Sequence, residues 1–418
     1  MTQICARHNH SSGCRLQSSR RGELSTADSI APVSGNPDLA IDQLRSAVSG
    51  LSDQQQRDAV AATFFADHAL PVVEGNLCTF ATRAAADSVH LRHRINPWPD
   101  DLELALIPGT DVWFLTIELE WAARVEYQFE IVRDGERWRF NDPYNPRLAR
   151  SPVGDCSVCY GPGYAAPDWA TFRADTDSGQ LVERQVHSLA QGRDNRVTVY
   201  LPAGFETSMR YPVLIVHDGG DYLGYSSMKS VLDNLIHDKK LAKIIVAFTY
   251  PGERLIEYPD DPDHAQWITC ELLPDLERQF PLLADPSGRC LMGTSFGAVS
   301  ALSTAVRFPG TYGSLLLQSG SFLYSDPRVR HGEGADFDPV MRFIDHYRAA
   351  PVRAAERAFI SCGAYEDLVD ANRGMLPIFR STGMKINYVE SPDGHSWEAW
   401  RDHLGPGLCW LFPGDPEE

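Results

Sequence analysis

Hydrophobic and polar positions follow two different periods along this chain, and the change of period predicts its division into parts. Between residues 41 and 64, apolar side chains recur every three or four positions, which is the spacing of one helical face. The positions are Ile41, Leu44, Val48, Leu51, Val60 and Phe64. A break near Gly50 predicts two short amphipathic helices. Residues 1–40 are polar, rich in serine and aperiodic, so we expect a disordered tail there.

Residues 71–150 show the two-residue period of β-strands. Apolar and polar side chains alternate over 89–95, 113–119 and 127–131. Asp134 and Gly135 then separate the last run from an aromatic one at 138–140, and an Asp-Gly pair favours a tight hairpin turn. Several short strands with turn signals predict a β-sandwich, so we expect residues 41–150 to form a helical lead-in and a sandwich domain. The stretch 151–182 is rich in proline and glycine and predicts a linker.

From residue 183 to residue 418, strands alternate with helices. The strand-like runs are 196–201, 213–216, 243–248, 289–292, 313–318, 358–362 and 385–389, and helical segments such as 228–238, 265–279 and 372–382 lie between them. This order predicts a domain of the α/β class, with a parallel sheet and helices on both faces. Ligands bind at the carboxyl ends of the strands in such sheets. The loops that follow the strands are therefore the places to look for chemistry.

Composition and charge exclude several classes of function. The chain has 418 residues, long enough for two or three domains, and its formal net charge of −18 argues against nucleic acid or an anionic membrane as a partner. The sequence contains no run of eighteen apolar residues, so a membrane span is not expected. The N-terminal residues lack the apolar core of a secretory signal. Together these features predict a cytoplasmic protein whose partner is a small molecule.

The nine cysteines are odd in number and scattered, which does not indicate a disulfide framework and is consistent with a reducing compartment. Cys156 and Cys159 form a C-x-x-C pair, but no second pair or histidine pair completes a zinc set. A phosphate-binding loop is also missing. We therefore expect no metal and no other cofactor.

One short motif carries the strongest chemical signal. The apolar run 289–292 leads into Gly293-Thr-Ser-Phe-Gly297, and small residues follow at the start of a helix. This G-x-S-x-G pattern is typical of the nucleophile elbow, in which the chain turns so sharply from strand to helix that only glycine fits two positions before and after the serine. Ser295 is the candidate nucleophile.

A serine nucleophile needs a base, and the base needs an acid that orients it. In this type of fold the chain order is serine, acid, histidine. Glu366 and Asp367 follow the predicted strand 358–362, and either could be the acid, with Glu366 favoured. His395 lies in the loop after the strand 385–389, just before a helix, and is the candidate base.

The reaction also needs donors for the oxyanion that forms on the substrate. The Phe296 N–H is one candidate, because it directly follows the nucleophile. The second is expected from the turn after the strand 213–216, where Gly219 and Gly220 allow close approach of the backbone to a substrate. His217 in the same turn is expected to have a structural role.

The joint motifs of residues 183–411 resemble the enterochelin esterase and esterase D family of α/β-hydrolases. The stretches that carry the resemblance are His217-Asp-Gly-Gly-Asp-Tyr222, Arg254-Leu-Ile-Glu-Tyr258, Glu271-Leu-Leu-Pro274, Met292-Gly-Thr-Ser-Phe-Gly297, Gln318-Ser-Gly-Ser-Phe322, Cys362-Gly363, Asn372-Arg373 and Gly394-His-Ser-Trp-Glu-Ala-Trp-Arg401. The segment ending in Asp142-Pro-Tyr-Asn-Pro146 also looks like the immunoglobulin-like N-terminal domain of the cytoplasmic ferric-enterobactin esterases. The resemblance implies an α/β-hydrolase domain preceded by a small immunoglobulin-like β-sandwich domain.

The resemblance also implies a reaction and roles for single residues. Ser295 would be the nucleophile, His395 the base and Glu366 the acid, in the hydrolysis of a catecholate siderophore such as a trilactone of dihydroxybenzoylserine. The family often has Gly-Gly-His-Asp where this chain has Asp393-Gly-His-Ser396. A ferric tris-catecholate is a trianion that favours arginine or lysine in its site. The candidates for this contact are Arg254, Arg373 and Arg401.

Two other functions compete with a siderophore esterase. A carbohydrate esterase of the feruloyl or acetyl type shares the same catalytic domain, and the missing secretion signal argues against it. A ligand-binding protein with a vestigial hydrolase domain belongs to a different class of function. The ordered serine, acid and histidine argue against that interpretation.

Overall fold

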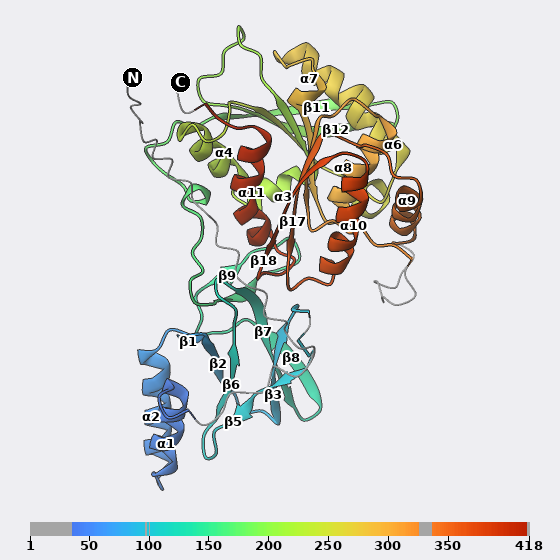
Figure 1. Cartoon of the computed structure of the whole chain (residues 1–418). Helices are drawn as coiled ribbons and strands as arrows, with labels where there is room; N and C mark the ends of the chain where they lie inside the picture. The colour runs from blue at the N-terminus through green and yellow to red at the C-terminus, as the bar shows by residue number, and fades with distance from the viewer. Residues whose placement is uncertain (1–35, 97, 100, 326–336, 416–418) are drawn as a thin grey trace, which may run out of the picture.

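The structure, a computed structural model, describes residues 36–96, 98–99, 101–325 and 337–415, which form a smaller N-terminal part and a larger C-terminal part (Figure 1). Residues 1–35 of the tail expected over 1–40 lie outside the described residues. Ala40, the last residue of that expected tail, is the first residue of a helix. None of the described helices is long and apolar enough to cross a membrane.

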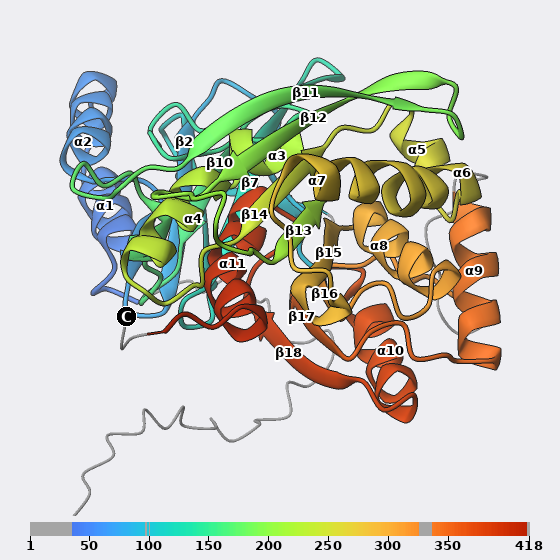
Figure 2. The same ribbon diagram turned by 90° about the horizontal axis from the view of Figure 1, so that it is seen from above.

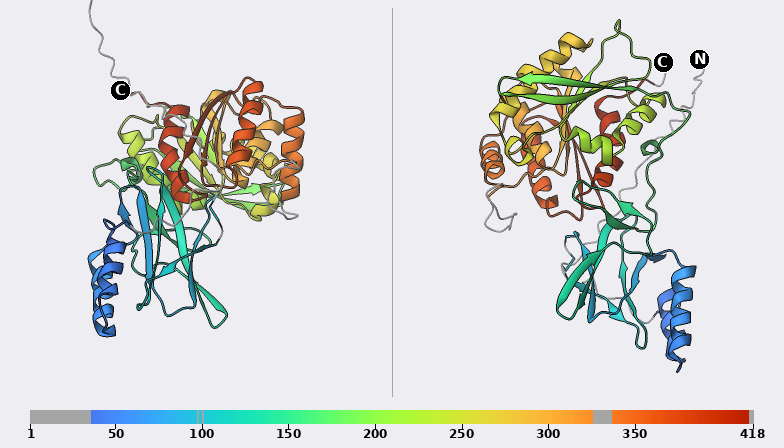
Figure 3. Two further views of the ribbon diagram at one scale, coloured as in Figure 1. Left: turned by 60° about the horizontal axis from the view of Figure 1, so that its bottom comes forward. Right: turned by 180° about the vertical axis from the view of Figure 1, so that it is seen from behind.

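The two helices predicted around Gly50 are present as α1 (Ala40–Ser49) and α2 (Gln54–Asp67). Asp53 begins α2 because its carboxylate accepts a hydrogen bond from the Gln56 N–H at 3.2 Å. Apolar side chains of both helices, among them Ile41, Val48 and Phe64, pack in one cluster with residues of the neighbouring sheet. Figure 3 shows both helices on the outer side of the N-terminal part, away from the large sheet.

Two antiparallel sheets follow and share one core, which forms a β-sandwich. One sheet has the order β1-β2-β6-β5, and the other has the order β4-β3-β7-β10-β9 with β8 paired to β7. The strands are β1 (Val72–Glu74), β2 (Leu77–Arg83), β3 (Ser88–His93), β4 (Leu102–Glu103), β5 (Ala105–Leu106), β6 (Val112–Glu118), β7 (Arg124–Arg133), β8 (Glu136–Phe140), β9 (Leu148–Ala149) and β10 (Cys156–Tyr160). Asp134 (φ 52°) and Gly135 (φ 80°) make the predicted hairpin turn. That the sandwich is of the immunoglobulin type stays a prediction.

The stretch 151–182 differs from the linker that its composition predicted. Strand β10 lies within it and pairs with both β7 and β9. Cys159 is fully buried in the core of the sandwich. The strand is only five residues long and its three central residues are all buried, so it has no alternating pattern that the sequence could show among the prolines and glycines. After β10, the chain crosses to the second part through a short 3-10 helix (Asp168–Ala170).

The C-terminal part is built on an eight-stranded sheet with the order β11-β12-β14-β13-β15-β16-β17-β18. Its strands are β11 (Gln180–Ser188), β12 (Arg193–Leu201), β13 (Val213–Val216), β14 (Ile245–Thr249), β15 (Arg289–Thr294), β16 (Ser314–Gln318), β17 (Arg357–Gly363) and β18 (Lys385–Ser391). The sheet is parallel from β14 to β18, whereas β11 and β12 are antiparallel. The expected all-parallel sheet is therefore wrong at this edge, where a hairpin joins the first two strands.

Helices cover both faces of this sheet, as predicted (Figure 2). One face packs against α3 (Gly219–Tyr225), α4 (Met228–His237) and α11 (Trp397–Leu411). The other packs against α7 (Leu273–Gln279), α8 (Phe296–Arg307), α9 (Asp338–Ala349) and α10 (Val369–Ser381). The short helices α5 (Arg254–Glu257) and α6 (Pro262–Gln266), a π-helical turn (Trp267–Leu272) and a 3-10 turn (Pro286–Gly288) complete the part.

The carboxyl ends of β17 and β18 lie beside the N-terminal part (Figure 1). Two backbone hydrogen bonds cross the boundary there: Arg124 N–H donates to the Pro392 carbonyl at 3.0 Å, and Asn96 N–H donates to the Tyr365 carbonyl at 2.8 Å. The sheet edge that carries the candidate residues therefore contacts the sandwich.

Candidate active site

Ser295 lies in a strained turn between β15 and α8. Its backbone has φ 56° and ψ −122°, a combination that residues with a side chain rarely adopt. The turn is so tight that a β-carbon added at Gly293 would lie 2.2 Å from the Gly297 carbonyl oxygen. The sharp turn that the G-x-S-x-G motif predicted is present, and it holds the half-buried Ser295 at the carboxyl end of β15.

The loop after β16 lies directly against Ser295. The Ser321 Oγ is 3.2 Å from the Ser295 Oγ, and the Ser321 N–H donates to the Ser295 carbonyl at the same distance. The Ser295 N–H donates to the carbonyl of Gln318, the last residue of β16, at 3.0 Å. These bonds fix the backbone of the elbow from the neighbouring strand.

Glu366 and His395 form a close pair at the carboxyl ends of β17 and β18. The Glu366 Oε2 lies 2.7 Å from the His395 Nδ1, and the Glu366 side chain is buried while that of His395 is one-third exposed. A β-carbon at Gly363 would lie 2.2 Å from the Asp393 carbonyl oxygen, so glycine allows the two loops to approach. Asp367 is exposed on the surface. Of the two predicted carboxylates, Glu366 is the one in contact with the histidine.

Three further residues hold Glu366 directly or through a neighbour, and sequence reasoning assigned none of them a role. Ser319 donates through its Oγ to the Glu366 Oε1 at 2.5 Å, and the Gly363 N–H donates to the same oxygen at 2.7 Å. Trp400 donates through its Nε1 to the Ser319 Oγ at 2.8 Å, and its ring lies edge-on to the His395 ring with centroids 4.8 Å apart. The Gln318-Ser-Gly-Ser-Phe322 stretch after β16 was the signal in the sequence, because it follows the strand next to the elbow.

The predicted oxyanion donors begin two neighbouring helices. Phe296 is the first residue of α8, and Gly219 and Gly220 are the first two of α3. N–H groups in the first turn of a helix have no acceptor within that helix. The two turns are close together, because β13 pairs with β15 and a β-carbon at Gly297 would lie 3.3 Å from the Asp218 Oδ2.

The three predicted substrate-binding arginines have different surroundings. Arg373 pairs with Glu390 and Asp370 on the surface, and Arg401 donates to Asp402. Arg373 lies on α10 and Arg401 on α11, and each is paired with an acidic side chain.

Arg254 lies beside the elbow. Its Nη2 is 2.8 Å from the Asp218 Oδ2 and 3.4 Å from the Thr294 carbonyl, and its guanidinium lies 5.9 Å from the centre of the Phe296 ring. Burial opposes the charged form, but the Asp218 carboxylate outweighs burial and raises the pKa of Arg254. About a third of this side chain is exposed.

His217 has the structural surroundings that its position predicted. It is fully buried, and its Nδ1 donates to the Met292 carbonyl at 2.9 Å. Burial, with the neighbouring His264 second, lowers the pKa of His217 to about 3. The ring is therefore neutral near pH 7. Across the described ranges of the chain, no group of three or more histidine, cysteine or acidic side chains could hold a metal ion.

Comparison with known proteins gives a consistent result. Residues 188–411, more than half of the chain, match the family described as putative esterase. The iron(III) enterobactin esterase of Dickeya dadantii is 24% identical over 355 residues, which cover 76% of this chain and 80% of that protein. The endo-1,4-beta-xylanase/feruloyl esterase of Xylanibacter ruminicola is 23% identical over 261 residues, which cover 59% of this chain and 33% of that protein. The crystal structure of the enterobactin esterase from Shigella flexneri in the presence of enterobactin has a TM-score of 0.66 at 22% identity. That match covers 80% of this chain and 92% of the other, and it shows a shared fold.

Proposed function

The chain belongs to the putative esterase family of carboxylic ester hydrolases, and from this premise we propose that it is a serine esterase that cleaves the ester bonds of a catecholate siderophore. One observation carries the catalytic part of the proposal. The Glu366 Oε2 lies 2.7 Å from the His395 Nδ1 at the same sheet edge as the strained Ser295 elbow. An acid, an imidazole and a serine in this order support acyl transfer by serine.

In the proposed mechanism, the Ser295 Oγ attacks the ester carbonyl carbon while the His395 Nε2 takes the hydroxyl proton. The negative charge that develops on the carbonyl oxygen receives hydrogen bonds from the Phe296 N–H and from an N–H of Gly219 or Gly220. The C–O bond of the ester then breaks, and the imidazolium gives its proton to the leaving alkoxide. A water molecule, deprotonated by His395, hydrolyses the acyl-serine and regenerates the free enzyme.

Glu366 supports both half-reactions through His395. By accepting the Nδ1–H, it keeps the lone pair of the imidazole on Nε2, and its negative charge stabilises the imidazolium. Its second oxygen is held by two other donors, Ser319 Oγ and the Gly363 N–H, so the carboxylate cannot turn away. The acid is therefore fixed before substrate binds.

Sequence similarity that extends beyond the C-terminal part of the chain supports a siderophore as the substrate. A match over 76% of the chain has to include residues of the N-terminal part, and this relative is an iron(III) enterobactin esterase. The match to the feruloyl esterase covers a smaller share of this chain, 59%. Arg254, beside the elbow and about one-third exposed, supplies a cation for a trianionic ferric complex, although Asp218 offsets part of its charge.

Ser295→Ala tests the catalytic part. The variant should fold normally and lower kcat for p-nitrophenyl butyrate by roughly 10⁴-fold, because the members of the triad act as a unit. Ser303→Ala is the matched control, since this buried serine lies on α8, the helix that follows the elbow, and its Oγ bonds to the Ser300 carbonyl and to Asp260 and not to Glu366 or His395. A fluorophosphonate probe should label Ser295 in the wild type. Labelling at a different serine would contradict the assignment.

Substrate comparison tests the siderophore part. We expect the wild type to hydrolyse a ferric catecholate trilactone with a higher kcat/KM than feruloyl or acetyl sugar esters. A preference for the sugar esters would favour the carbohydrate esterase instead. A protein that binds the siderophore tightly but hydrolyses none of these esters would be a ligand-binding protein with a vestigial site.

A further inference from the structure

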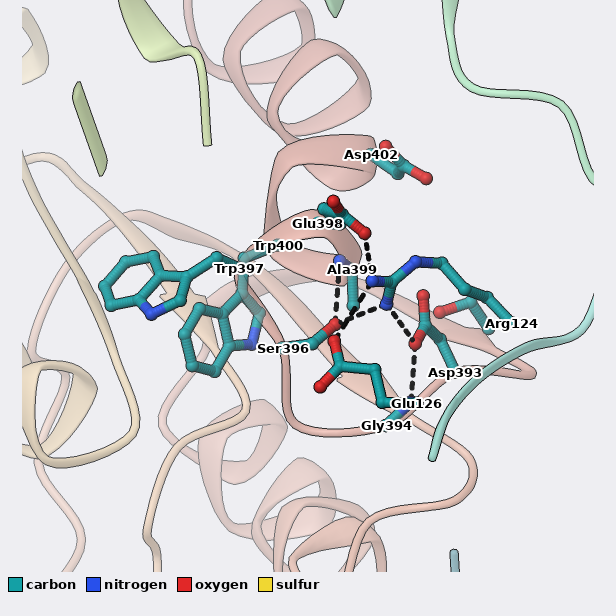
Figure 4. A network of polar contacts seen from close by, with 12 residues as sticks. Arg124, Glu126, Asp393, Gly394, Ser396, Trp397, Glu398, Ala399, Trp400 and Asp402 are labelled. Carbon is teal, nitrogen blue, oxygen red and sulfur yellow. Dashed lines mark hydrogen bonds and ion pairs between the residues drawn. The ribbon is translucent and has the colours of Figure 1, made fainter. Parts of the chain in front are cut away.

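A buried arginine of the N-terminal part contacts the loop that carries His395. Arg124 is the first residue of β7, and it is 1% exposed. Its Nη1 lies 3.2 Å from the Asp393 Oδ1 and 2.8 Å from the Ser396 Oγ. Its Nη2 bonds to Glu398 and lies 3.0 Å from the Glu126 Oε1 (Figure 4). One guanidinium therefore joins β7 to the histidine loop and to the first turn of α11.

These contacts lie on both sides of His395. Before it, the Asp393 Oδ1 accepts the Gly394 N–H at 2.7 Å, and the Pro392 carbonyl accepts the Arg124 N–H at 3.0 Å. After it, the Ser396 Oγ accepts the Ala399 N–H at 3.2 Å and so begins α11. Arg124 thus binds the two side chains that shape the loop at either end of the histidine.

The N-terminal part also contacts the loop of the acid. Asn96 N–H donates to the carbonyl of Tyr365, which directly precedes Glu366, and the ring of Trp98 lies 6.5 Å from the Tyr365 ring. A cavity of only about 20 Å³ remains between Arg124 and His395. Both the acid and the base are therefore held against the sandwich with little free space.

The charges at this boundary depend on one another. Burial opposes the charged form of Arg124, but Asp393, Glu398 and Glu126 outweigh burial and raise the pKa of Arg124 above its usual range. Without the guanidinium, these carboxylates would lose the one cation that contacts all three of them, which is unfavourable for partly buried charges. The histidine loop would then relieve the repulsion by moving toward water.

We propose that Arg124 is a positioning residue for His395, so that the N-terminal part completes the active site of the C-terminal part. The inference rests on the proposed function, in which His395 is the general base. It follows from geometry, because His395 must stay 2.7 Å from the Glu366 Oε2 while its Nε2 meets Ser295. A displacement of about 1 Å at a reacting group can lower a rate by roughly 10²-fold.

Arg124→Met tests the inference in the full chain with neutral p-nitrophenyl butyrate. We expect kcat to fall roughly 10- to 100-fold and KM to stay within about threefold, because Arg124 acts on the base and not on the substrate. Arg124→Lys keeps the charge and should recover part of the lost kcat. Arg137→Met is the matched control, since Arg137 is an exposed arginine of the same sheet that pairs with Glu130. Its kcat should equal that of the wild type.

A proton NMR signal separates positioning from a general loss of stability. The His395 Nδ1 proton, in its short bond to Glu366, should give a far-downfield resonance in the wild type and in Arg137→Met. In Arg124→Met, at a temperature where circular dichroism shows a folded protein, we expect the resonance to be lost or shifted. An unchanged resonance together with an unchanged kcat would overturn the inference. So would a raised KM with an unchanged kcat, because Arg124 would then contact the substrate.

Asp393→Asn covers the case in which Arg124→Met does not fold. Asparagine keeps the shape and the bond to the Gly394 N–H, but it cannot carry the negative charge that pairs with Arg124. We expect kcat to fall roughly 3- to 10-fold without a change in KM, and an unchanged kcat would refute the inference. Failure of the proposed function has a different signature, because the wild type itself would then not hydrolyse the ester or Ser295→Ala would remain active.

Discussion

Replacing Glu366 by glutamine tests whether this carboxylate fixes the tautomer of His395. In the native site three donors point at its two oxygens: His395 Nδ1 at Oε2, and Ser319 Oγ and the Gly363 N–H at Oε1. A carboxylate only accepts hydrogen bonds, so it satisfies all three. A glutamine amide has one accepting oxygen and one donating NH₂ group. It therefore cannot satisfy both sides of the site.

In the Glu366→Gln variant, the surrounding groups favour the orientation of the amide that places its NH₂ toward His395. With the oxygen toward Gly363 and Ser319, the NH₂ faces the His395 Nδ1, so the ring must carry its proton on Nε2 and cannot take one from the nucleophile. The opposite orientation sets the NH₂ against the Gly363 N–H and leaves a buried donor unpaired, at a cost of about 1–3 kcal/mol. Ser319 can accept from this NH₂ through its second lone pair, since Trp400 Nε1 uses only one, but the Gly363 N–H remains unpaired. The wrong tautomer should therefore dominate by roughly 5- to 150-fold.

Loss of the negative charge adds to the loss of the productive tautomer, because the imidazolium is no longer stabilised. We expect Glu366→Gln to lower kcat for p-nitrophenyl butyrate by roughly 10³- to 10⁴-fold, equivalent to about 4–5.5 kcal/mol of transition-state stabilisation. Asp367→Asn is the control, and because Asp367 is exposed its kcat should stay within about twofold of the wild type. A folded Glu366→Gln enzyme that keeps more than about a tenth of the wild-type kcat would refute this reasoning.

Two further predictions concern charge. Arg254→Gln should raise KM for a ferric catecholate about tenfold, which is the lower range for a charge-assisted contact because Asp218 shares the cation. KM for p-nitrophenyl butyrate should stay nearly unchanged, and an equal change in KM for both substrates would contradict the electrostatic role. Burial lowers the pKa of His217 from 6.5 in the unfolded chain to about 3 in the native state. Between pH 3 and pH 6.5 the unfolded state therefore binds a proton that the native state does not, and the free energy of unfolding decreases as pH falls below 6.5. In urea unfolding, His217→Asn should therefore lose about 2–3 kcal/mol less stability than the wild type between pH 7 and pH 4.5, and identical losses would show that the ring is protonated in both states.

The sequence predicted the elements whose signal is local. The period of apolar residues located α1, α2 and most strands of the large sheet, and the glycines around Ser295 predicted the elbow because the turn itself requires them. The choice between Glu366 and Asp367 could not be made in this way, because both carboxylates occupy the same turn. Only the three-dimensional position of Ser319 and Gly363 selects Glu366 for contact with the histidine.

The contact of Arg124 with the histidine loop was beyond sequence reasoning for a different reason. Arg124 and Asp393 are 269 residues apart in the chain, and β7 reads as an ordinary strand of a sandwich. Only one of its partners, Glu126, lies on the same strand, whereas Asp393, Ser396 and Glu398 come from the C-terminal part of the chain. The spacing of apolar residues predicts which positions face a core, but it does not predict which side chains contact a buried arginine.

The Nη1 of Arg124 contacts one side chain on each side of Gly394 and His395, namely Asp393 and Ser396. A carboxylate that is buried without a cation is costly, and burial indeed raises the pKa of Asp393 to about 7 even beside the guanidinium. Arg124 therefore stabilises the ionised form of Asp393, and Ser396 supplies a neutral acceptor for the same nitrogen at 2.8 Å. Residues 124, 393 and 396 thus act as one unit across the domain boundary, and substituting the loop alone would remove the contacts that hold His395 in place.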